Sequence, residues 1–260
     1  RIRKGVDNRM QPFRAFLRSD RWPDLRQHPS DQQKGVPAPA LEQPCPPAAT
    51  LIDLPAPDTF TVGRMPLVEA IGRRQSQRRY TTEPLTLEEL AFFLWAAQGV
   101  RETGEHGKTP YVLRTVPSAG ARHPFETYLL VNRVEGLVSG LYHYQSLEHR
   151  LCLLDTDDRL VERVHEGCFG QYAKNSAVTF LWTAVPYRTE WRYSIVSPKL
   201  IALDAGHMCQ NLYLACTAVG AGACAIAAYD QPMLDAVLDV DGDDEFVIYV
   251  ATVGKVRDAS

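Results

Sequence analysis

Residues 176–185 read Ser-Ala-Val-Thr-Phe-Leu-Trp-Thr-Ala-Val, and this nearly continuous apolar run is the strongest fold signal in the chain. Its length and its β-branched and aromatic side chains favour a strand over a helix. The run does not alternate apolar and polar positions, as a half-exposed strand would, so both faces are expected to be covered. A strand covered on both faces needs helices on either side of its sheet, which predicts a layered α+β fold.

The segments around this strand predict a mixture of helices and strands without strict βαβ alternation. Thr86 and Glu89 form a capping-box pattern at the start of one helix. Polar residues between two short apolar runs indicate a hairpin. The expected helices are 66–74, 86–98, 157–167, 198–219 and 231–238, and the expected strands are 125–133, 140–144, 150–154, 176–185, 223–228 and 246–253.

The helix expected at 198–219 has apolar residues almost all round, interrupted by Asp204, His207, Gln210 and Asn211. Such a helix should be buried on nearly every side. In a chain of 260 residues this indicates either a central helix sheathed by the sheet or a helix at a subunit interface.

Residues 1–60 differ from the rest because they hold most of the prolines and show little periodicity. Proline favours extended conformations, so an arm is expected to run across the body or onto a second subunit after one short helix. Residues 61–260 are expected to form the single compact domain.

The overall composition fits a cytoplasmic globular protein. The net charge of −3 argues against a dedicated nucleic-acid binder. The chain contains no apolar run long enough to span a bilayer and no signal-peptide pattern. The six cysteines have no regular spacing and are predicted to be reduced, mostly buried thiols, and neither they nor the histidines predict a metal site.

A basic run, Arg-Arg-Gln-Ser-Gln-Arg-Arg-Tyr at 73–80, follows the first expected helix. Arg74, Ser76 and Arg78 could converge on one anion such as a phosphate. A solvated basic surface is an equally good explanation of this segment taken alone.

Two further segments are rich in small residues. Pro117-Ser118-Ala119-Gly120 forms a tight turn before the strand at 125, where the backbone is accessible to a flat ligand. Gly220 can be explained as the cap of the long helix, whereas the small residues at 225–228 leave the backbone open to a bound molecule. An ordinary loop remains an alternative for each.

Together these segments resemble the nitroreductase superfamily of FMN-dependent oxidoreductases, and within it the SagB-type dehydrogenase or azoline oxidase branch. The family's Arg-x-Ser-x-Arg pattern stands at Arg74, Ser76 and Arg78, and its Pro-Ser-Ala-Gly loop at 117–120. Its Asp-Ala-Gly-His helix, followed by Gln-Asn-Leu, stands at 204–207 and 210–212.

This resemblance implies a nitroreductase-like three-layer sandwich: a mixed, mainly antiparallel sheet flanked by helices, in an obligate homodimer around a central long helix. It also implies two FMN sites built by both subunits. Residues implied for the flavin phosphate are Arg74, Gln75, Ser76, Arg78 and Lys255; those for the flavin face are Pro117, Ser118, Ala119 and Gly120, commonly from the partner; those beside flavin N5 are Ala225, Ile226, Ala227 and Ala228.

The sequence departs from the azoline oxidase pattern just before the long helix. A Lys-Tyr pair proposed to handle the proton in that branch falls on Arg192 and Tyr193. An arginine stays protonated and cannot serve as a base near neutral pH. Arg192 and Tyr193 are therefore candidate catalytic residues, with simple packing and ion pairing as the alternative.

The expected activity is hydride transfer between FMN and a small organic or peptide-derived substrate, with NAD(P)H as a possible donor. Two alternatives stay open: a non-catalytic flavin-binding accessory subunit of a peptide-modifying complex, and a phosphate-ligand binding protein that never holds flavin.

Overall fold

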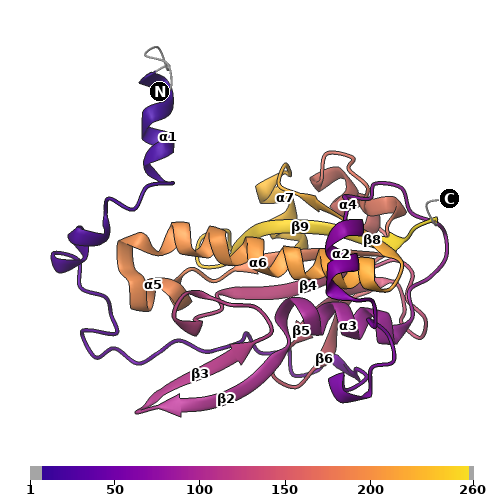
Figure 1. The fold of residues 1–260 in the computed structure, drawn as a ribbon, viewed down its shortest axis with the longest axis horizontal. Helices are drawn as coiled ribbons and strands as arrows, with labels where there is room; N and C mark the ends of the chain where they lie inside the picture. The colour runs from indigo at the N-terminus through magenta and orange to yellow at the C-terminus, as the bar shows by residue number, and fades with distance from the viewer. Residues whose placement is uncertain (1–7, 258–260) are drawn as a thin grey trace.

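The computed structural model describes residues 8–257, so the first seven residues of the expected arm and the last three residues of the expected domain lie outside it. Its centre is a seven-stranded sheet in the order β1-β6-β5-β4-β7-β9-β8 (Figure 1). The strands are β1 (Thr50–Asp53), β4 (Phe125–Val131), β5 (Gly140–Gln145), β6 (Arg150–Asp155), β7 (Val178–Ala184), β8 (Ala221–Ile226) and β9 (Phe246–Lys255).

Neighbouring strands of this sheet pair antiparallel. Parallel contacts are recorded as two isolated bridges, Ser76 with Ala223 and Leu85 with Val134. Helices lie on both faces of the sheet, so the expected α+β layered fold is confirmed. The helices are α1 (Gln11–Ala15), α2 (Leu67–Arg73), α3 (Leu87–Gln98), α4 (Leu160–Gly167), α5 (Tyr187–Tyr193), α6 (Ser197–Ala218) and α7 (Gln231–Leu238).

Strand β7 shows why its sequence lacks alternation. Phe180 and Trp182 point into the core shared with α3 and α6, whereas Leu181 packs in the core with α4 and α7. All seven residues of the strand are buried. Each face of β7 is therefore covered by a helical layer, which makes apolar side chains favourable at successive positions.

Helix α3 begins as its sequence indicates. The Thr86 side chain accepts a hydrogen bond from Glu89 N, and the Glu89 side chain accepts one from Thr86 N. This reciprocal arrangement satisfies two backbone donors that a helix start otherwise leaves without partners.

Three features of the fold were not expected from the sequence. Strand β1 lies in the proline-rich segment and pairs with β6 at the sheet edge. A separate hairpin of β2 (Val100–His106) and β3 (Thr109–Arg114) extends from the body (Figure 1). Helix α5, which comes just before α6 and ends at Tyr193, was not expected either. All three are short or exposed, so tertiary pairing decided their conformation more than periodicity did.

The expectation for the cysteines is wrong for two of the six. Cys45 and Cys152 form a disulfide that joins the proline-rich segment to β6, and the two cysteines are 107 positions apart in the sequence. The other four are free and buried, as expected: Cys168, Cys209, Cys216 and Cys224. The sequence spacing of Cys45 and Cys152 could not indicate the bond, because only the packing of the arm brings the two sulfurs together.

The segment from 29 to 49 lies along the body and makes several buried polar contacts. Trp191 Nε1 donates to Val36 O, and Arg188 Nε donates to Ala40 O, each at 2.9 Å. Before this segment the chain turns away, and α1 projects from the body (Figure 1). Phe13 and Leu17 of this projecting part are 71% and 66% exposed.

Candidate functional site

The basic run 73–80 leaves the end of α2 and lies beside β8. Gln77 N donates to Ala223 O at 2.8 Å, and Ser76 forms the parallel bridge to Ala223. Gly222 is required by this close approach, because a Cβ at that position would lie 2.5 Å from the Gln77 side chain. The predicted phosphate-binding segment and the predicted small-residue segment are thus neighbours.

Tyr213, on α6, joins these two segments. Its hydroxyl lies 3.0 Å from Ser76 Oγ and accepts a 2.8 Å hydrogen bond from Ala225 N. The Arg74 guanidinium lies over the Tyr213 ring, 5.4 Å from its centroid. Sequence reasoning missed Tyr213 because it counted the residue as apolar. The available signal was its hydroxyl, since a tyrosine within a packed helix usually finds a polar partner.

The arginines of this segment differ in their ion pairs. Arg73 pairs with Glu69 at 2.8 Å. Within residues 8–257, neither Arg74 nor Arg78 pairs with a carboxylate; Arg78 donates weakly to Ser76 O at 3.4 Å. Two guanidinium groups without carboxylate partners beside a serine hydroxyl are a donor set suited to a phosphate. Gln75 is exposed in the same segment.

Lys255 ends β9 near this segment, and its backbone O accepts a 2.9 Å bond from Thr81 N. Its ammonium group, however, pairs with the buried Glu89 carboxylate at the start of α3. A bound phosphate would have to compete with this ion pair for Lys255.

The residues at 225–228 lie at and just beyond the end of β8. Ala225 is half-buried, and the Ile226 side chain packs in the core. Ala227 and Ala228 are exposed, and Gln171 Nε2 donates to Ala228 O at 2.8 Å. Small side chains therefore leave the backbone accessible at 227 and 228.

The loop 117–120 is held by α6. Ser118 Oγ and Ala119 N donate to Asp204 Oδ2 at 2.6 and 3.0 Å, and Ser118 Oγ also accepts from His123 N. Burial raises the pKa of Asp204, while the bonds from Ser118 and Ala119 oppose that shift. Pro117 is the exposed residue of the loop.

Arg192 and Tyr193, at the end of α5, lie against the same loop. Gly120 has a φ of +59°, and a Cβ there would lie 2.7 Å from the Tyr193 hydroxyl and 2.8 Å from Arg192 Nε. The Arg192 guanidinium lies 5.7 Å from the Tyr193 ring centroid. The ring of Trp22, from the projecting arm, meets Tyr193 edge-on at 6.2 Å.

The predicted site residues therefore fall into two groups, and within a single chain these groups lie apart from each other. The phosphate group gathers around Tyr213, and the loop group is tied to Asp204 near the other end of α6. The two anchors are nine positions apart on the helix, which corresponds to about 13 Å along the axis. Helix α6 also exposes a stripe that includes Ala202, Leu203, Gly206, His207 and Gln210, so it is not covered on nearly every side within this chain.

Comparisons with known proteins agree with this architecture. Residues 71–255 match the model of the Nitroreductase family. A Methanocaldococcus jannaschii protein named as a nitroreductase is 31% identical over 190 residues, which cover 73% of this chain and 90% of that protein. The trifolitoxin-processing protein TfxB of Rhizobium leguminosarum bv. trifolii is 28% identical over 144 residues, 54% of this chain and 37% of TfxB.

Solved structures are similar as well. A crystal structure named as a nitroreductase from Ralstonia eutropha matches with a TM-score of 0.64 and 26% identity, covering 85% of this chain and 97% of that one. A chain of the E. coli microcin synthetase McbBCD complex shares the fold, with a TM-score of 0.60 and 18% identity, covering 95% of this chain and 86% of that one. The matched family model and the M. jannaschii relative together show that this chain belongs to the nitroreductase family.

Proposed function

We propose that this protein is an FMN-dependent oxidoreductase that transfers hydride between flavin and a small organic or peptide-derived substrate. The observation that carries the proposal is the junction at Tyr213. One hydroxyl contacts both Ser76 of the proposed phosphate segment and Ala225 of the segment proposed to lie beside flavin N5. These residues are far apart in the sequence, so the fold has brought together two segments that FMN binding would require.

The donor set fits a flavin phosphate. Arg74 and Arg78 carry charges that no carboxylate of residues 8–257 neutralises, and Ser76 adds a hydroxyl. FMN, when bound, would supply the two-electron chemistry. The chain would supply the phosphate grip through Arg74, Gln75, Ser76 and Arg78, with Lys255 recruited from Glu89, and backbone groups at 225–228.

The separation of the two groups along α6 supports a homodimer. If the loop 117–120 contacts flavin, a second copy can bring its loop to the Tyr213 group of the first. The exposed part of α6 at Gly206, His207 and Gln210 provides a free surface for that pairing. Two sites, each built by both copies, would follow from a twofold axis.

Arg192 and Tyr193 are the proposed residues on the substrate side. They lie directly on Gly120, so their side chains would be near whatever the loop contacts. Arg192 can stabilise a developing negative charge but cannot accept a proton near neutral pH. The Tyr193 hydroxyl is the remaining candidate for proton transfer, which favours substrates that do not need a lysine base.

The similarity to TfxB, which is named for processing trifolitoxin, supports a peptide-derived substrate over a free nitro compound. It equally suits the second candidate, a flavin-binding accessory subunit of a peptide-modifying complex. Turnover distinguishes the two candidates, because an accessory subunit would bind FMN without reducing any acceptor.

The test is to purify the wild-type protein with Arg78→Ala and Arg79→Ala variants and to measure flavin absorbance per protein. We expect wild type and Arg79→Ala to retain FMN, and Arg78→Ala to lose most of it. Anaerobic addition of NADH or NADPH should then bleach the bound flavin. Full retention of flavin by Arg78→Ala would refute the phosphate assignment, and a colourless wild type that does not take up FMN would refute the proposed function.

Substrate chemistry can be tested at Arg192. If a lysine base is what azoline oxidation requires, Arg192→Lys should raise turnover of a thiazoline-containing peptide while leaving flavin content unchanged. No change in turnover would indicate that Arg192 has a packing role.

A further inference from the structure

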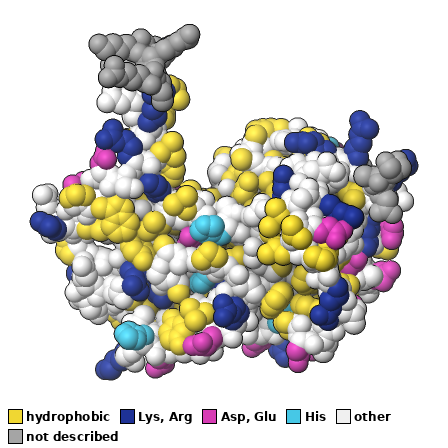
Figure 2. Space-filling view, viewed as in Figure 1, with side chains coloured by type: hydrophobic (Ala, Val, Ile, Leu, Met, Phe, Trp, Pro, Cys, Tyr) yellow, Lys and Arg dark blue, Asp and Glu magenta, His cyan; other side chains and the backbone are white. Residues whose placement is uncertain are grey.

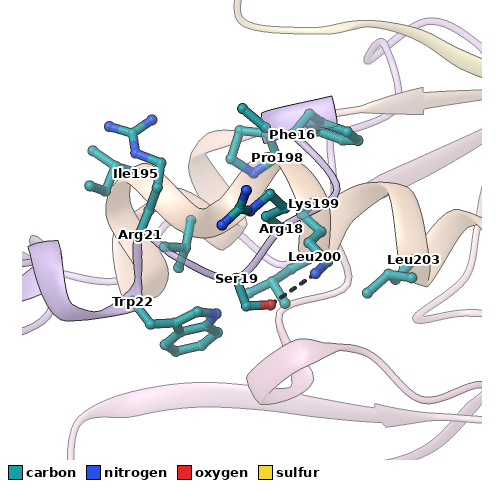
Figure 3. A pocket seen from close by; sticks show the side chains of 12 residues that line it. Phe16, Arg18, Ser19, Arg21, Trp22, Ile195, Pro198, Lys199, Leu200 and Leu203 are labelled. Atoms are coloured by element: carbon teal, nitrogen blue, oxygen red, sulfur yellow. Dashed lines mark hydrogen bonds between the residues drawn. The ribbon is translucent and has the colours of Figure 1, made fainter. Parts of the chain in front are cut away.

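A cavity of about 250 Å³ lies between the projecting arm and the start of α6. Figure 3 shows Arg18, Ser19, Arg21 and Trp22 of the arm on one side and Pro198, Lys199, Leu200 and Leu203 on the other. None of these residues belongs to the proposed FMN-binding set. The cavity is nevertheless close to the proposed substrate side, because Trp22, which lines the cavity, also contacts Tyr193.

The charged side chains that line the cavity are all positive. Among the described residues, three cationic side chains line it, Arg18, Arg21 and Lys199, and no carboxylate does. Lys199 Nζ donates to the neutral Ser19 Oγ at 2.9 Å, the dashed contact in Figure 3. An ammonium group offers three donors, so Lys199 retains capacity for an anionic acceptor.

Each of the two arginines forms an exposed ion pair with a carboxylate outside the cavity. Arg18 pairs with Asp20 at 2.5 Å and Arg21 with Asp24 at 3.9 Å, and all four side chains are more than half exposed. Exposed pairs of this kind contribute little free energy and are screened by salt. Both guanidinium groups can therefore exchange these partners for a ligand carboxylate at low cost.

The remaining walls are apolar. Trp22 is 43% exposed and Leu203 is 53% exposed, although both line this cavity. Apolar side chains are also exposed where the arm meets the body (Figure 2). A free inorganic anion would satisfy the cations and leave these walls in water. A peptide with an acidic residue next to an apolar one would satisfy both.

We propose that this cavity binds an acidic residue of a peptide substrate, with an adjacent apolar side chain against Trp22 and Leu203. This inference rests on the proposed function, because it places the substrate's reacting group near Tyr193 while the acidic residue is held at Lys199. The class of substrate is then a peptide with a carboxylate close to the ring or bond that is oxidised or reduced.

Fluorescence anisotropy with two labelled decapeptides tests whether the cavity binds an acidic residue of a peptide. The peptides share a Leu-Phe core and differ only in having two aspartates or two asparagines beside it. We expect the purified protein to bind the aspartate peptide about tenfold more tightly than the asparagine peptide, since a hydrogen bond to a charged group is stronger than one to a neutral group by roughly that factor. This preference should shrink at high salt, because salt screens the charges. Lys199→Gln should remove most of the preference, and Lys199→Arg should keep it.

Lys174→Gln is the matched control, because Lys174 is an exposed lysine that pairs with Glu162 away from this cavity. It should leave the preference intact. Equal affinity for the two peptides, or a preference that Lys199→Gln leaves unchanged, would overturn the inference. So would displacement of the aspartate peptide by acetate or phosphate at the concentration at which the unlabelled peptide displaces it, which would identify a small-anion site only.

Flavin content and NAD(P)H-dependent bleaching are measured on the same preparations. A preparation with bleachable flavin but no peptide preference would refute the cavity assignment alone. A preparation without flavin that retains the preference would support the cavity and count against the proposed oxidoreductase function.

Discussion

The Ser118 hydroxyl donates a 2.6 Å hydrogen bond to Asp204 Oδ2, which ties the loop 117–120 to the helix α6. The same carboxylate oxygen accepts from Ala119 N, so one buried side chain fixes two consecutive residues of the loop. Asp204 is thus a positioning residue for the loop that is proposed to contact flavin.

Replacing Asp204 with alanine should release this loop. A hydrogen bond to a charged group contributes about 1.5–3 kcal/mol, so we expect the unfolding free energy to fall by about that amount. Amide hydrogen exchange at residues 118–120 should become faster. Asp204→Asn keeps an acceptor oxygen and should show a smaller effect on both measurements. Unchanged exchange in Asp204→Ala would show that the loop is held by other contacts.

Tyr213→Phe should weaken the junction between Ser76 and Ala225. The substitution leaves Ala225 N and Ser76 Oγ without their Tyr213 partner, and an unsatisfied polar group costs about 1–3 kcal/mol. We expect lower FMN affinity in a titration of apoprotein and a lower melting temperature. Tyr111→Phe, on the β2–β3 hairpin, removes a comparable hydroxyl bond to Glu102 and should leave FMN affinity unchanged.

Gly120→Ala should displace Arg192 and Tyr193, because the new Cβ would approach both within 2.8 Å. Substrate turnover should fall by an order of magnitude or more, in line with the sensitivity of catalysis to small misplacements. Gly107→Ala provides a control, since Gly107 also has a positive φ but has no neighbour within 4 Å of the added Cβ. If both variants lost turnover equally, the loss would come from replacing a glycine at positive φ and not from contact with Arg192 and Tyr193.

His123 should make the fold sensitive to acid. Burial, and then the neighbouring Arg114 and Arg122 charges, lower the pKa of His123 from 6.5 to about 3. Between these two values the unfolded chain binds a proton that the folded chain does not, so stability falls as the pH drops below about 6.5. The slope from this residue approaches about 1.4 kcal/mol per pH unit.

Urea unfolding from pH 7 to pH 4 checks this contribution. His123→Gln should flatten the dependence relative to wild type, although the variant can be less stable overall. His106→Gln, at an exposed position, should keep the wild-type slope. An identical slope in wild type and His123→Gln would contradict the assignment.

The Cys45–Cys152 disulfide should stabilise the arm on the body. It links residues 107 positions apart in the sequence, and a disulfide typically contributes about 2–4 kcal/mol. We expect Cys45→Ser to lower the unfolding free energy by that amount and to increase proteolysis between residues 29 and 49. A reducing agent should reproduce the effect in wild type and add nothing to Cys45→Ser. Stability that is insensitive to both would show that hydrogen bonds alone hold the segment.

No helix in the described part of the chain is long and apolar enough to cross a membrane. The longest, α6, carries Asp204 and His207 among its apolar residues, and one side of it packs on α3 and the sheet.

The sequence alone determined the elements whose signals are local. The apolar run of β7 indicated a strand covered on both faces, and Thr86 and Glu89 indicated the start of α3. In these cases the residues that carry the signal also make the decisive contacts, with their own backbone or with the helical layers above and below. The resemblance to a family rested on the same kind of short, local patterns.

Only the tertiary structure decided the contacts between distant segments. Cys45 meets Cys152, β1 joins β6, and Tyr213 joins Ser76 to Ala225, although nothing in the spacing of these residues predicts their partners. The structure also places the Asp204 and Tyr213 groups at different ends of α6. Such arrangements depend on how whole helices and strands pack, because the free energy of a long-range contact comes from burial and pairing that no single segment contains.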